Sequence, residues 1–175
     1  MAVDDIGDMT KQAPWFIEER AFAFASLVLT KRNDVKVQPH AGRDPAIDLL
    51  VEVLKDGKPT VRFFGVQLVP CMDLTTIQTA DERVRSHPGG DPLEASLPLC
   101  VLVIGVRKPE GIYRWSVEPV VEDGRALLHR NEESNWQTLD EAGAARLLGQ
   151  VTAWYDALNG GSNPKPRGRL SKMGS

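Results

Sequence analysis

The stretch DPAIDLLVEVLKDGKPTVRFFGVQLV, residues 44–69, decides the predicted fold. Apolar residues recur at every second position of its first half, which is the period of a strand with one buried face: Ile47, Leu49, Val51 and Val53. Asp56-Gly57 is a signal for a tight hairpin turn, and the returning half is rich in branched and aromatic residues. We therefore predict an antiparallel hairpin of strands 47–54 and 60–69.

The segments on either side of this hairpin predict further helices and strands. Apolar positions recur at helical spacing from Trp15 to about Thr30, and residues around Val35 and Val37 alternate like a short strand. Residues 73–86 are predicted to be helical. The run from Leu99 to Val106 is almost uninterrupted in its apolar character, which is typical of a strand buried on both faces. Residues 112–121 and 126–129 are predicted strands.

The last predicted element is a helix that ends at about Leu158. Thr138-Leu139-Asp140-Glu141 has the pattern of a capping box that would open it. Its apolar stripe consists of Leu147, Leu148, Val151, Trp154, Tyr155 and Leu158. The order helix, strands, helix, strands, helix predicts an α/β fold with a central mixed sheet flanked by helices.

The length of 175 residues suits one domain, which we assign to residues 14–158. Residues 1–13 are polar and aperiodic and are predicted to be disordered, and residues 159–175 are predicted to form a flexible basic tail. The acidic N-terminus has no secretion-signal pattern, and no apolar run approaches the roughly 20 residues of a membrane span. We therefore expect a cytoplasmic protein without membrane contact, in which Cys71 and Cys100 are buried thiols.

The net charge of −3 argues against a broad nucleic-acid-binding surface, because duplex binding depends mainly on Lys and Arg contacts to phosphates. The tail carries four positive charges in a short polar segment: Lys165, Arg167, Arg169 and Lys172. We expect any nucleic-acid affinity to be weak, salt-sensitive and concentrated in this tail.

Asp48 and Gln67 are the candidate site residues, because they face one another if the hairpin pairs around Asp56-Gly57. Hydrolysis of a phosphodiester with Mg²⁺ needs oxygen ligands for the ion, and it benefits from a nearby cation. Asp48 and Gln67 would be the metal ligands, and Glu19 on the first helix could supply a further carboxylate. The sequence contains no Ser/His/Asp or Cys/His arrangement and no glycine-rich phosphate loop.

These motifs resemble the bacterial DUF4365 family, a branch of the PD-(D/E)XK (restriction-endonuclease-like) nuclease superfamily. Its members show a helix glutamate, then Asp-Tyr-Gly-Ile-Asp, a strand with Gln-Val-Lys-Ser, an apolar strand and a strand with Tyr and Trp. The corresponding segments here, in the same order between residues 15 and 158, are Glu19, Asp44–Asp48, Val66–Pro70, Leu97–Val103 and Tyr113–Trp115. The resemblance implies a restriction-endonuclease-like core.

The chain departs from that pattern at the catalytic lysine, whose position is held by Val69. An aliphatic side chain cannot donate to phosphate or water, and Pro70 removes a backbone donor directly after it. Lys55 and Lys58 belong to the far end of the hairpin, and Arg62 belongs to the opposite strand face from Gln67. The remaining candidate cations outside the motif are Lys36, His40 and Arg43.

Three functional hypotheses remain open from the sequence. The first is a catalytically degenerate nuclease-fold domain that binds nucleic acid or protein in a bacterial cytoplasm, which the lost lysine favours; the resemblance implies a setting in defence or in mobile elements. The second is an active Mg²⁺-dependent nuclease with a relocated cation. The third is a purely structural or homo-oligomerising protein, in which the apolar strand 99–106 and the final helix matter most. Asp44 and Asp48 would then be only turn and strand-edge residues.

Overall fold

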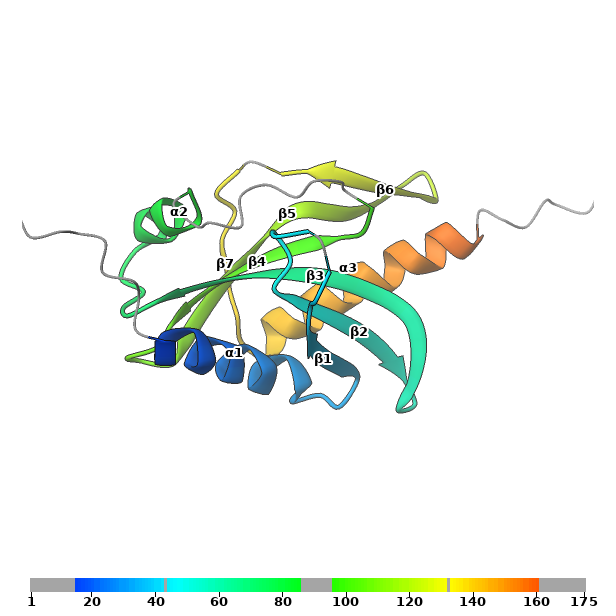
Figure 1. Ribbon diagram of the computed structural model, residues 1–175. Coiled ribbons are helices and arrows are strands. Elements are labelled where there is room, and N and C mark those ends of the chain that lie inside the picture. The colour runs from blue at the N-terminus through cyan, green and yellow to red at the C-terminus, as the bar shows by residue number, and fades with distance from the viewer. Residues whose placement is uncertain (1–14, 43, 86–95, 132, 161–175) are drawn as a thin grey trace, which may run out of the picture.

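The computed structural model describes residues 15–42, 44–85, 96–131 and 133–160, which form one sheet with helices on both faces (Figure 1). The described helices are α1 (Trp15–Thr30), α2 (Ile77–Arg85) and α3 (Glu141–Gly160). The strands are β1 (Val35–Pro39), β2 (Leu49–Lys55), β3 (Lys58–Cys71), β4 (Leu99–Gly105), β5 (Glu110–Glu122), β6 (Arg125–Arg130) and β7 (Gln137–Thr138). The predicted disordered N-terminus lies outside the described residues, as does the predicted basic tail from residue 161 on. Residues 159 and 160, predicted to begin that tail, belong instead to the end of α3.

The sheet has the order β1-β2-β3-β4-β5-β6, and β7 pairs with β5 beside β6. The β3–β4 pair is parallel and is connected through α2, whereas the other described pairs are antiparallel. The predicted α/β fold with a mixed sheet flanked by helices is therefore confirmed.

The hairpin of β2 and β3 forms around the predicted turn. Asp56 and Gly57 have φ angles of 53° and 72°, the left-handed values that a two-residue turn of type I′ requires at both central positions. Leu49 pairs with Val66, so the register brings Asp48 next to Gln67, as the predicted hairpin requires. The strands begin and end slightly differently from the prediction, because Ile47 and Asp48 precede β2 and β3 continues to Cys71.

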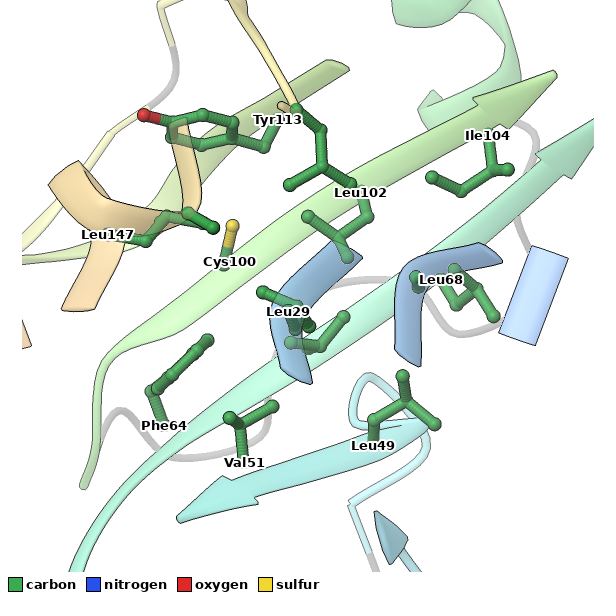
Figure 2. Close-up of a cluster of buried hydrophobic side chains, with 14 of the residues drawn as sticks. Leu29, Leu49, Val51, Phe64, Leu68, Cys100, Leu102, Ile104, Tyr113 and Leu147 are labelled. Atoms are coloured by element: carbon green, nitrogen blue, oxygen red, sulfur yellow. The ribbon is translucent and has the colours of Figure 1, made fainter. Parts of the chain in front are cut away.

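The main hydrophobic core lies on the sheet face that α1 and α3 cover. Figure 2 shows how side chains from both helices and from four strands meet there: Leu29, Leu49, Val51, Phe64, Leu68, Cys100, Leu102, Ile104, Tyr113 and Leu147. A smaller cluster on the opposite face packs under α2. Every residue of β4 is buried, as predicted for a strand covered on both faces.

The start of α3 differs from the predicted capping box. Asp140 is the capping residue, because its Oδ1 accepts the Gly143 N–H at 2.7 Å. Thr138 belongs instead to β7, where it pairs with Ile112, and Glu141 forms an ion pair with Lys31 of α1 at 2.8 Å. On the apolar stripe of α3, the predicted core residue Leu158 is exposed.

Among the described residues, no helix combines the length and the apolar character that crossing a membrane requires.

Cys71 and Cys100 are both free thiols and both buried, as predicted. Burial raises the pKa of Cys71 and raises that of Cys100 well above its ordinary value, because the thiolate is the form that desolvation disfavours. We therefore expect Ellman's reagent to label neither thiol rapidly in the native protein at pH 8, and both in denaturant. Rapid native labelling that Cys71→Ser removes would show that β3 opens locally at its end.

Candidate functional site

Asp48 lies between the end of β1 and the start of β2, and its backbone is hydrogen-bonded to β3 and to the residue that follows β1. Its N–H donates to the Val66 carbonyl at 2.9 Å, and its carbonyl accepts the His40 N–H at 2.8 Å. Because Leu49 pairs with Val66, Asp48 lies next to Gln67 at the following position of the hairpin. The structure therefore brings these two predicted site residues together.

The Asp48 carboxylate is hydrogen-bonded to the backbone of β3. Its Oδ2 accepts the Leu68 N–H at 2.6 Å, a charge-assisted hydrogen bond of the short and strong kind. This N–H lies beyond the last residue that β2 pairs with, so the side chain satisfies a donor that the sheet itself does not reach. The carboxylate thus has a structural role at this strand end.

The segment before Asp48 forms a compact turn that covers the sheet. Asp44 holds it, because its Oδ1 accepts the Ala46 N–H at 3.0 Å and its carbonyl accepts the Ile47 N–H at 3.2 Å. Ala46 is fully buried against Leu99 and Val117, with Ile47 packed beside them. Ala46 therefore lies where packing governs the choice of residue, whereas Pro45 beside it is exposed.

Gln67 and Val69 share the sheet face that α2 covers. Gln67 is only 4% exposed and pairs with Val101 of β4. Val69 is 2% exposed and packs in the apolar cluster with Cys71, Ala80, Val101 and Val103. The position at which the family resemblance implies a lysine is thus part of a hydrophobic core, where a charged side chain would be strongly disfavoured.

Glu19 is not brought to this site. It is exposed on α1, and α1 packs on the sheet face that carries Phe64, Val66 and Leu68. Successive side chains of a strand point to opposite faces, so Gln67 faces away from α1. The orientation of α1 on the sheet depends on its apolar residues, which the position of a single glutamate in the sequence does not reveal.

The residues around Asp48 do not fit a dedicated Mg²⁺ site. Among the described residues, no group of three or more His, Cys, Asp or Glu side chains could hold a metal ion. Asp48 offers one carboxylate that already accepts a backbone N–H, and Gln67 offers one buried amide oxygen. The hard oxygen ligands that Mg²⁺ prefers are therefore too few here without ligands from a substrate.

Sequence reasoning missed Arg114 of β5. Gln67 pairs with Val101, and Val101 pairs with Arg114, so the three residues form one row across β3, β4 and β5. Two strand spacings separate the ends of this row by about 10 Å. The signal in the sequence was a single arginine between Tyr113 and Trp115, both of which are buried.

The other predicted binding residues, Lys165, Arg167, Arg169 and Lys172, lie outside the described residues.

Comparison with known protein families, with curated protein sequences and with solved structures finds no match to this chain.

Proposed function

We propose that the chain is a catalytically degenerate domain of restriction-endonuclease-like ancestry that works as a binding module for nucleic acid or protein. The observation that carries the proposal is the burial of Val69 at the position of the motif lysine. A nuclease of this type needs a cation beside the developing charge, and a valine packed under α2 cannot supply one.

The order of the elements supports the proposed ancestry. A helix with Glu19 precedes the meander, Asp48 stands at the start of β2, and Gln67 lies on β3 beside it. The buried strand β4 and the strand with Tyr113 and Trp115 then follow. This is the order that the resemblance to the DUF4365 family implies, and α2 connects β3 to β4 in parallel.

The hydrogen bond of Asp48 supports a non-catalytic role for the same site. In the proposed module the carboxylate has kept its place in the fold because it holds the end of β3. The family setting of such a module would be a bacterial cytoplasm, in defence against foreign DNA or in mobile elements, with nucleic acid or a protein as the partner.

The second candidate function is an active Mg²⁺-dependent nuclease with a relocated cation. Arg114 favours it, because it lies in the same cross-strand row as Gln67. Arg62 does not, since its guanidinium is paired with Asp156 of α3 at 2.6 Å. A distance of about 10 Å between strand positions is long for an arginine that would act at the same phosphate as Asp48.

Two measurements test the proposal: nucleic-acid cleavage by the purified protein, and the free energy of unfolding of its variants. We expect the protein with Mg²⁺ or Mn²⁺ to leave plasmid, single-stranded DNA and RNA uncut above background. We expect Asp48→Ala to lower the free energy of unfolding by about 1–3 kcal/mol, because the Leu68 N–H loses its acceptor. Asp48→Asn, which keeps an acceptor oxygen, should lose less, as measured by urea denaturation.

Glu19→Ala is the matched control, because this carboxylate is exposed on α1. It should change the unfolding free energy by no more than about 0.5 kcal/mol. Metal-dependent cleavage that Asp48→Ala abolishes while the protein stays folded, and that Glu19→Ala leaves intact, would overturn the proposal and establish the nuclease.

A further inference from the structure

A gap in the pairing of β5 creates a crevice away from Asp48. The strand β6 pairs with Val117–Glu122, and β7 pairs with Ile112 and Tyr113. On this edge, residues 114–116 pair with no strand in the described part of the chain. The connection from β6 to β7 passes here, and its Asn131 N–H donates to the Ser116 carbonyl at 2.9 Å.

Arg114 lines this crevice and has a single hydrogen-bond acceptor among the described residues. Its Nη1 donates to the Asn131 carbonyl at 3.2 Å, and its guanidinium lies 5.2 Å from the centre of the Trp136 ring. Its Nε is buried without an acceptor, and no carboxylate of the described residues lies within ion-pairing distance. A guanidinium has five N–H donors, so a partly buried one with a single acceptor is incompletely satisfied.

The Trp136 ring is held over the arginine by α2. Its Nε1 donates to Asp81 Oδ1 at 2.8 Å, and the Ser134 hydroxyl donates to Asp81 Oδ2 at the same distance. Asp81 therefore fixes two residues of the connection at once. This arrangement restrains the guanidinium before any ligand arrives, which lowers the entropic cost of binding.

The crevice has the size and polarity of a small-ligand site. Its volume is about 340 Å³, within the range of small-molecule pockets. Beside Arg114 and Trp136, its polar walls come from Glu118, Asn131, Asn135 and Gln137. Glu118 is the acidic member, and its Oε2 accepts the Asn131 Nδ2 at 3.4 Å.

We propose that this crevice binds the phosphate group of a small ligand, with Arg114 as the anchor. A phosphate offers the oxygen pair that an arginine fork recognises. It also supplies a counter-charge that no described carboxylate provides within ion-pairing distance of Arg114. The group could come from a mononucleotide or from the 5′ end of a nucleic-acid strand. The site stands on Arg114 and its neighbours, whether or not the domain descends from a nuclease.

The experiment measures binding of inorganic phosphate and AMP to the full chain by calorimetry at low salt. The wild-type protein should bind both, and Arg114→Gln should weaken binding about tenfold or more, the loss expected for charge-assisted hydrogen bonds. Glu118→Gln should tighten binding, because it removes a negative charge from the crevice wall. Arg62→Gln, which removes an arginine that is already paired on another strand, should bind like the wild type.

Two oligonucleotides distinguish the sources of the phosphate. A 5′-phosphorylated tetranucleotide that displaces AMP, when its 5′-hydroxyl counterpart does not, would assign the crevice to strand ends. Displacement by neither oligonucleotide would assign it to free phosphate monoesters.

Three results would overturn the site. The first is no binding by the wild-type protein at about 10 mM phosphate. Even a weak site with a Kd of about 1 mM would be roughly nine-tenths occupied at that concentration. The second is an equal loss in Arg62→Gln, which would indicate a general charge effect. The third is unchanged or weaker binding in Glu118→Gln, a result that counts even if Arg114→Gln fails to fold.

Discussion

Replacing Phe64 by alanine should lower the free energy of unfolding by about 3–5 kcal/mol, the range for removing a buried aromatic ring. Phe64 lies on β3, is completely buried, and contacts Trp115 edge to face with 6.1 Å between ring centres. Figure 2 shows it on the sheet face that α1 and α3 cover, where several elements meet. Because sheet and helices enclose the ring, the cavity left by alanine cannot easily collapse.

Urea denaturation followed by circular dichroism measures this loss. Leu27→Ala is the matched control, since Leu27 is 69% exposed on α1 and should change the unfolding free energy by no more than about 0.5 kcal/mol. A loss below about 1 kcal/mol for Phe64→Ala would mean that the two-helix face is not the main core of the protein.

Gly143→Ala should destabilise the protein by about 2–3 kcal/mol, against the usual preference of helices for alanine. A Cβ at Gly143 would lie 2.2 Å from the Thr138 carbonyl oxygen and 3.0 Å from Tyr113 Cε1. That carbonyl belongs to β7, which pairs with β5, so it cannot move without disturbing the sheet. The contact explains why a glycine occupies the first turn of α3.

Gly149→Ala in the same helix is the control with the opposite sign. A Cβ there would meet nothing within 4 Å, so alanine should stabilise the protein by about 0.5–1 kcal/mol through helix propensity alone. Thermal unfolding of the two variants measures both effects. Stabilisation by both substitutions would show that β7 does not pack closely against α3 in solution.

The hairpin and the first helix could be predicted because their signals are local. Alternation along β2, the Asp56-Gly57 turn and the helical spacing of α1 each lie within one segment of the chain. The cap of α3 could not be placed, because Thr138 and Asp140 both suit a helix start. The choice between them depends on the pairing of Thr138 with Ile112, a contact with a distant strand.

The candidate site, too, could be predicted from the sequence only in part. The proximity of Asp48 and Gln67 follows from the hairpin turn, which sets their register. The separate location of Glu19 depends on how α1 packs, and the row from Gln67 to Arg114 depends on pairings across three strands. No periodicity within one segment carries that information, so Arg114 appeared in the sequence only as an isolated charge in a strand.

The single parallel pairing, β3 with β4, has a consequence for the order of folding. On one side of it, β1, β2 and β3 pair in chain order, and on the other side β4, β5 and β6 do so, with β7 added to β5. Such hairpins can form from short-range contacts, whereas parallel strands need a long crossover to close first. We therefore expect joining of the two meanders to be the slow step. A substitution that strengthens a meander formed before this step should speed folding, whereas one that acts only on the joined domain should mainly slow unfolding.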